Sequence, residues 1–221
     1  GSLERLIAAC EAHPDSVLTP LQLNYRAPEH IDDNAFGHVQ QMREMLEDAL
    51  LGRPLAQAYT APTIIGAAMF ARRAVWANIG EFDPLFWFYG VDDDICTRAR
   101  WLGYATLLVP GAHLYHAHGK LDAPGQQPTK AARLRKWRNE LQARYIFLLK
   151  APEHSLARNC LTAARYALGI AFENLRYLWP AGAWHALAIY AHCLSRYGVL
   201  AQTRRRHFDP ARKIGAGGRQ A

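Results

Sequence analysis

One long stretch of this sequence constrains the fold more than any other feature. From Lys130 to about Ala201 the residues are almost all compatible with helix. The pattern is interrupted near Pro152 and near Pro180, because proline lacks a backbone N–H and ends or kinks a helix. The second half of the chain is therefore expected to be a helical region, and any sheet has to come from the residues before it.

Residues 1–128 alternate between helix and strand patterns, which is typical of an α/β arrangement. The expected helices are Leu3–Cys10, Val39–Ala49, Arg72–Ile79 and Asp92–Leu102, and the expected strands are Ser16–Leu23, Thr63–Ala71, Ala105–Val109 and Ala112–His116. Pro20 favours an edge position for the first strand. So few strands would make an unusually small open sheet. The predicted fold class is α/β, a partial mixed sheet with flanking helices followed by a C-terminal helical region.

The net charge of +7 is concentrated at the C-terminus, where residues 204–221 hold six basic residues against Asp209. This glycine-rich segment is expected to be a disordered basic tail. It could contact anionic lipid or nucleic acid, or it could be a solvated terminus without a specific role. The four cysteines are far apart and form no C-x-x-C pair, which argues against a zinc cluster or a disulfide framework.

Asp92, Asp93 and Asp94 stand together where a helix is expected to begin. Acidic side chains at a helix N-terminus compensate the helix dipole, so capping alone could explain them. One of them could instead act as a general base or metal ligand where a loop meets a helix.

Three further groups are candidates for chemistry. His116 and His118 would share one face of a strand and could hold a metal, although most such pairs are not ligands. The aromatic run from Phe82 to Tyr89 suits either core packing or stacking against a sugar ring. The basic stretch from Arg135 to Asn139 suits either a solvated helix face or phosphate contact.

Several short motifs follow one another in a fixed order between residues 66 and 119. They are Gly66, Arg72-Arg73, Gly80-Glu81-Phe82-Asp83, Phe86 to Tyr89, Val91 to Asp94, Arg98-Ala99-Arg100, Gly103-Tyr104, Pro110, and His116 with Gly119. Their order and spacing resemble glycosyltransferase family 2, in particular its rhamnosyltransferase-like branch. Arg138-Asn139 and the apolar run to Lys150 also resemble the segment that follows in that family.

The resemblance implies a GT-A-like fold and an inverting hexosyltransferase that uses a nucleotide-sugar donor and a glycan or lipid-linked acceptor. Asp92 matches the general base, His116 matches the histidine that reaches the metal or the diphosphate, and Gly66 matches a close approach of backbone to substrate. The other residues expected to contact donor or acceptor are Trp87, Tyr89, Asp93, Asp94 and Arg138. Asp83 and Arg98 are interpreted as structural.

The sequence also departs from the family pattern. Val91 stands where the family has Glu, so one acceptor-site carboxylate is absent. The family's metal-binding Asp-x-Asp and nucleotide-binding strands would precede Leu3. The divalent metal, Mg or Mn, is therefore expected to be bound mostly by an N-terminal half that this sequence lacks, and the chain alone is predicted not to transfer sugar.

The expected organisation has three parts. Residues 1–128 form the acceptor-side half of a GT-A domain, residues 129–203 a helical extension, and residues 204–221 the basic tail. Trp179–Ser195 is apolar with aromatic edges, and it predicts either an interfacial helix or a core-covering hairpin. The resemblance implies a cytoplasmic protein at the inner face of the membrane, in cell-wall or polysaccharide biosynthesis, with peripheral membrane contact and no nucleic-acid partner.

Two other functions stay open. A metal-dependent hydrolase could be built on Asp92, Asp94, His116 and His118. A non-enzymatic adaptor could use the basic helical end to bind membrane or nucleic acid.

Overall fold

The computed structural model describes residues 1–24, 27–31, 39–61, 63–116 and 129–214. The chain divides into two compact units. We call them the α/β unit, which comprises Gly1–Glu81, Ile95–Gln126 and Pro210–Ala221, and the helical unit, which comprises Phe82–Asp94 and Gln127–Asp209. The predicted coarse class, α/β with a helical region, is confirmed.

The boundaries of the units differ from the predicted ones. Residues 82–94 belong with the helices rather than with the sheet, and residues 210–214 return to the α/β unit. The prediction of a disordered tail is wrong for residues 204–214, because Arg204 to His207 end a helix and Pro210–Arg212 form a 3-10 turn. Residues 215–221 lie outside the described part of the chain.

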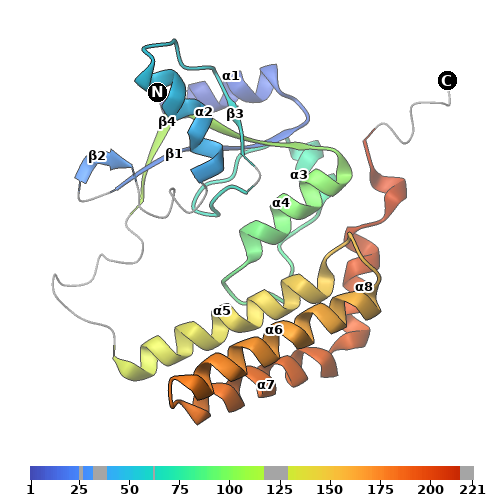
Figure 1. Ribbon diagram of the computed structural model, residues 1–221. Coiled ribbons are helices and arrows are strands. Elements are labelled where there is room, and N and C mark those ends of the chain that lie inside the picture. Colours follow the sequence, from blue (N-terminus) through green and yellow to red (C-terminus); the bar gives the residue numbers. More distant parts are fainter. Residues whose placement is uncertain (25–26, 32–38, 62, 117–128, 215–221) are drawn as a thin grey trace. The chain divides into compact units, whose positions relative to one another are not determined.

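A four-stranded mixed sheet is built from the described residues of the α/β unit, in the order β2-β1-β4-β3 (Figure 1). The strands are β1 (Ser16–Asn24), β2 (Ala27–Ile31), β3 (Tyr59–Thr60) and β4 (Ala105–His116). β1 and β4 are parallel, whereas β2 and β3 pair antiparallel with their neighbours.

The edge position predicted for β1 is wrong, because β1 pairs with a strand on each side. Pro20 is tolerated there because the pairing with β4 shifts register immediately after it, from Pro20↔Val109 to Leu21↔His113. Proline within a sheet is confined to edges and such irregularities. The same shift lets the two predicted strands around Pro110 form one continuous strand, β4.

No strand forms over Thr63–Ala71 among its described residues, contrary to the prediction. Only Phe70 joins the sheet, through an isolated antiparallel bridge to Leu18. Gly66 and Ala67 are exposed there whereas Ile64 is buried, so the apolar run is only partly buried.

Four helices belong wholly or partly to the α/β unit: α1 (Ser2–Ala12), α2 (Val39–Leu50), α3 (Arg73–Ile79) and α4 (Val91–Leu102). All four were predicted. Gly80 ends α3 with a positive φ of 88°, which favours glycine. Arg98 on α4 is fully buried and its guanidinium donates to the carbonyls of Ile79 and Gly80, as suits a structural role.

Four further helices make the helical unit: α5 (Lys130–Lys150), α6 (Leu156–Arg176), α7 (Pro180–Ser195) and α8 (Tyr197–His207). The helices α5, α6 and α7 lie side by side (Figure 1). The hydroxyls of Thr129 and Ser155 accept from the N–H groups of Ala132 and Arg158, which caps α5 and α6. The predicted helical stretch is thus confirmed, with an additional break at Arg196.

The helix α7 packs through small residues. Gly182, Ala183 and Ala186 are buried, and α6 and α7 are in extensive contact. The hydroxyl of Tyr145 on α5 donates to the carbonyl of Ala186 at 3.1 Å. One face of α7 therefore covers the core of the helical unit, while Trp184 lies exposed on another face.

No helix among the described residues is long and apolar enough to cross a membrane. The four cysteines pack as small side chains, with Cys10, Cys96 and Cys193 buried and Cys160 half-buried. Burial raises the pKa of the Cys193 thiol to about 11, so this thiol stays protonated near neutral pH.

Candidate functional site

The first turn of α4 presents the three predicted aspartates in different ways. Gly90, with a φ of 76°, precedes the helix and allows the chain to turn into it. The unpaired N–H groups of the first turn stabilise adjacent negative charges. Asp92 and Asp93 are half-buried, and the N–H of Asp93 donates to Asp92 Oδ1 at 3.1 Å. Asp94, one residue further, is buried.

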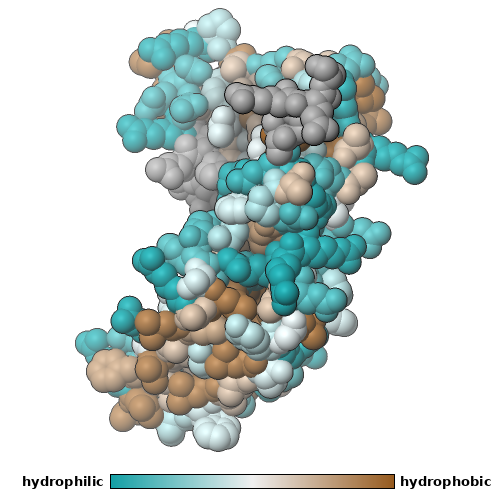
Figure 2. All heavy atoms as spheres, turned by 90° about the vertical axis from the view of Figure 1, so that its right-hand side faces the viewer, coloured by the Kyte–Doolittle hydropathy of each residue, from teal (hydrophilic) through white to brown (hydrophobic). Residues whose placement is uncertain are grey.

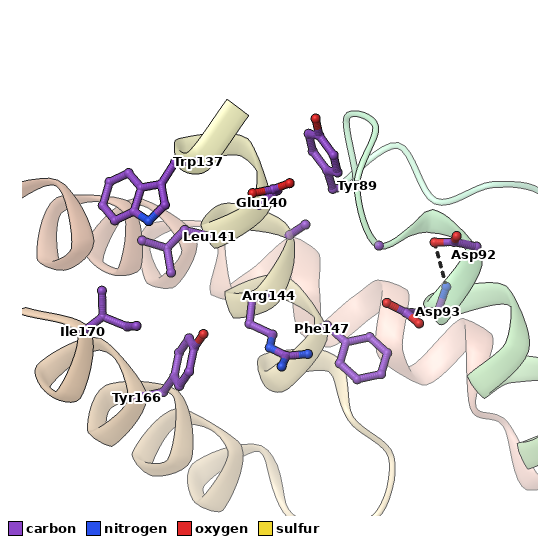
Figure 3. A pocket seen from close by; sticks show the side chains of 12 residues that line it. Tyr89, Asp92, Asp93, Trp137, Glu140, Leu141, Arg144, Phe147, Tyr166 and Ile170 are labelled. Carbon is purple, nitrogen blue, oxygen red and sulfur yellow. Dashed lines mark hydrogen bonds between the residues drawn. The ribbon is translucent and has the colours of Figure 1, made fainter. Parts of the chain in front are cut away.

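Asp92 and Asp93 line an open pocket of about 470 Å³ that lies wholly within the helical unit (Figure 3). We call it the Asp92 pocket. In Figure 3, Tyr89, Asp92 and Asp93 approach from one side, while side chains of α5 and α6 form the other. Its lining residues are Tyr89, Gly90, Asp92, Asp93, Trp137, Glu140, Leu141, Ala143, Arg144, Phe147, Tyr166 and Ile170.

The lining of the Asp92 pocket combines aromatic rings with charged groups. Trp137 and Phe147 come from α5 and Tyr166 from α6, so rings stand beside the carboxylates of α4. Glu140 adds a further carboxylate and Arg144 a cation. Such a mixture suits a polyhydroxylated ligand with apolar faces, because rings contact the C–H surface and carboxylates accept hydrogen bonds from hydroxyls.

Asp94 is not available to a ligand in this pocket. Its Oδ1 lies 2.5 Å from Lys150 Nζ, and Asp83 Oδ2 lies at the same distance from that nitrogen. Burial acts to raise the pKa of the Asp83 carboxyl, but the charge and hydrogen bond of Lys150 outweigh it, so this pKa lies below its ordinary value. The assignment of Asp94 as a ligand-binding residue is therefore replaced by a buried ion-paired role.

A metal fits poorly among the buried acids. Asp83, Asp94 and His207 lie close enough together to share an ion. However, the ammonium of Lys150 already lies between the two carboxylates and supplies their positive partner. His207 Nδ1 is 3.8 Å from Asp83 Oδ2, so it borders the same charges. A divalent ion would have to displace Lys150, and the geometry does not favour such a site.

The remaining predicted residues lie elsewhere. Trp87 is 86% exposed and Arg138 is also exposed, and neither lines the Asp92 pocket. Gly66 and His116 belong to the α/β unit. Gly66 is exposed between β3 and α3, and His116 is half-buried at the end of β4. His118 lies outside the described residues.

Sequence reasoning missed most of the α5 and α6 side of the pocket. Trp137, Glu140, Arg144 and Phe147 recur at intervals of three or four residues, which places them on one face of α5. A helix face that mixes aromatic and charged residues is a pattern from which a binding site could have been predicted. Nothing in the sequence, however, showed that this face meets the turn carrying Asp92.

Comparison with models of known protein families finds no match, and comparison with curated proteins finds no relative. The resemblance to glycosyltransferase family 2 therefore rests on the order of motifs in the sequence and on how far the site agrees with it.

Proposed function

We propose that this chain provides the acceptor-binding side of an inverting glycosyltransferase, with Asp92 as the general base. The observation that carries the proposal is the Asp92 pocket. Two half-buried carboxylates at a helix N-terminus face aromatic rings and an arginine, in a space of about 470 Å³. Pockets of several hundred Å³ are of the size that encloses small ligands. That the four-stranded sheet belongs to a GT-A-like fold is part of the same proposal.

The chemistry follows from the position of Asp92. An acceptor hydroxyl bound in the pocket gives its proton to the Asp92 carboxylate as its oxygen forms a bond to the anomeric carbon of the donor sugar. The bond from that carbon to the nucleoside diphosphate breaks on the opposite side, which inverts the configuration. Asp93 accepts a hydrogen bond from a neighbouring hydroxyl, and the rings of Tyr89 and Trp137 contact the apolar face of the acceptor.

The proposed cofactor is a divalent metal, Mg or Mn, which when bound neutralises charge on the leaving diphosphate. His116 is the residue of this chain proposed to reach it, and one imidazole supplies a single donor.

The first turn of α4, which carries the three aspartates, has a structure that disfavours the competing hydrolase. That enzyme would need Asp92 and Asp94 to act together on one metal. The carboxylate of Asp94 is instead buried and paired with Lys150, so only Asp92 of this pair can face a ligand in the pocket.

The test of the transferase is a comparison of Asp92→Asn with Asp15→Asn, a matched change in the exposed loop before β1. The assay is sugar transfer by the product of the complete reading frame that contains this sequence, together with acceptor binding followed by NMR. We expect Asp92→Asn to lower transfer by about 100-fold or more, with little change in acceptor binding. Transfer that survives in Asp92→Asn would refute the assignment of the base.

A peripheral membrane contact is a second part of the proposal, and it is supported by an exposed apolar face on α6. Figure 2 shows hydrophobic side chains gathered on the surface of the helical unit. The exposed apolar residues of α6 recur at the spacing of one helical face. They are Leu161, Leu168, Phe172 and Leu175. The helix also carries three arginines against one glutamate, which suits an anionic lipid surface.

Sedimentation with vesicles tests this contact. Vesicles of neutral phosphatidylcholine are compared with vesicles that also contain anionic phosphatidylglycerol. We expect Phe172→Ser to weaken binding to the anionic vesicles, whereas Phe82→Ser, at an exposed phenylalanine in the loop before α4, leaves it unchanged. Equal binding of both variants and the parent chain would refute the contact through α6.

A further inference from the structure

Lys150 is the last residue of α5, and its charged end lies in the core of the helical unit. The residue is 1% exposed, and its Nζ lies 2.5 Å from both Asp83 Oδ2 and Asp94 Oδ1. The ring of Phe86 lies 5.4 Å from the same nitrogen. A lysine is almost never fully buried unless its charge is paired, and here the pairing is twofold.

The two carboxylates come from the two ends of one short segment. Asp83 precedes the aromatic loop, and Asp94 lies in the first turn of α4. Tyr89, Asp92 and Asp93, which line one side of the Asp92 pocket, lie between these two anchors in the chain. Lys150 belongs to α5, which supplies most of the opposite side. A single ammonium group therefore joins the two walls of the pocket.

Hydrogen bonds from the side chains of Asn159 and Arg204 hold the end of α5, and with it the position of Lys150. The Nδ2 of Asn159, a buried residue, donates to the carbonyls of Leu149 at 3.2 Å and Ala151 at 2.7 Å. The guanidinium of Arg204 donates to the carbonyl of Ala151 and to that of His154. These bonds satisfy backbone carbonyls at the α5–α6 corner that lack partners within the helix.

We propose that Lys150 is the positioning residue of the Asp92 pocket. By binding both ends of the segment 83–94, it sets the turn that places Asp92 and Asp93 in the pocket, and it withdraws Asp94 from any ligand. Stability alone does not require this arrangement, because well-packed neutral residues often replace buried ion pairs without loss. Such a cluster can instead select one arrangement of the chain. Only the chemical class of the ligand in the Asp92 pocket rests on the proposed function.

Hydrogen exchange followed by mass spectrometry tests the inference without any sugar. Lys150→Met alone removes the ammonium that the two buried carboxylates share, so the helical unit is expected to lose most of its stability. The informative variant is Asp83→Asn/Asp94→Asn/Lys150→Met, in which the cluster is neutral and similar in size. We expect it to fold, with exchange at residues 84–93 at least about tenfold faster than in the parent chain and exchange in α6 unchanged.

Parent-like exchange at residues 84–93 in the triple variant would overturn the proposal, because packing alone would then fix the segment. Asp94→Asn is measured in parallel in case the triple variant does not fold. In this variant Lys150 keeps its ion pair with Asp83 but loses the one with residue 94. We therefore expect faster exchange only at residues 91–94. Unchanged exchange there would also overturn the proposal.

Lys136→Met is the control, since Lys136 is an exposed lysine of α5 that pairs with Glu140 at 3.7 Å. We expect it to leave exchange at residues 84–93 unchanged. The two proposals fail separately. If hydrogen exchange shows that Lys150 positions residues 84–93 but the parent chain binds no glycan, the transferase proposal is refuted and the positioning role stands.

Discussion

Replacement of Gly90 by alanine tests the geometry of the turn that opens the Asp92 pocket. Gly90 has a φ of 76°, in the left-handed region that L-residues rarely adopt. An added Cβ would lie 3.2 Å from Cδ1 and Cε1 of Phe86 and 3.4 Å from the Cβ of Ala143. Phe86 is itself buried, so its ring has little room to move away. The variant therefore combines backbone strain with a close contact.

A second glycine with a positive φ separates the cost of backbone strain from the cost of the close contact. The left-handed conformation costs an L-residue about 1–2 kcal/mol, and overpacking of a filled core costs about 1–3 kcal/mol. We expect Gly90→Ala to lower the free energy of unfolding of the helical unit by about 2–5 kcal/mol, the sum of both terms. Gly52 has a φ of 63° with nothing within 4 Å of its added Cβ. Gly52→Ala should therefore cost its own unit only about 1–2 kcal/mol.

Urea unfolding, followed separately for the transition of each unit, measures both variants. Acceptor binding to folded Gly90→Ala then shows whether the displaced turn also disturbs the pocket. Equal losses at Gly90 and Gly52 would refute the reasoning, because they would mean that Phe86 does not approach the turn as closely as the structure places it.

Three further outcomes are expected. The pKa of Asp83 is lowered by folding from its ordinary value of 3.8, so its contribution to stability is complete above that value and is lost as the pH falls through the lower folded value. Urea unfolding at a series of acidic pH values should show a shallower loss for Asp83→Asn. Arg204→Gln should lower the melting temperature of the helical unit by several degrees, because its guanidinium donates to backbone carbonyls of the α5–α6 corner. Arg205→Gln should not, because the exposed Arg205 donates at 3.4 Å to Ala201 within its own helix. Leu178→Gly should stabilise the helical unit by up to about 1 kcal/mol in urea unfolding, because this exposed leucine has a φ of 56°; a loss of stability would show that the leucine makes useful contacts.

The sequence by itself determined most of the helices and the presence of a small sheet. Pro152 and Pro180 lie at the breaks of the long helical stretch because proline cannot continue a helix, and Gly80 ends α3 because glycine accepts a positive φ. These are local effects, so a single chain read from end to end reveals them. The sequence also placed three aspartates in the first turn of α4.

Tertiary structure decided the rest, because it depends on residues far apart in the chain. β1 is an inner strand despite Pro20 because β4 shifts register opposite it. Asp92 and Asp94 are near neighbours with the same side chain, yet one lines a pocket and the other pairs with Lys150. Helical geometry turns consecutive residues to different faces, and only the packing of α5 determines which face meets an ammonium group and which meets open space.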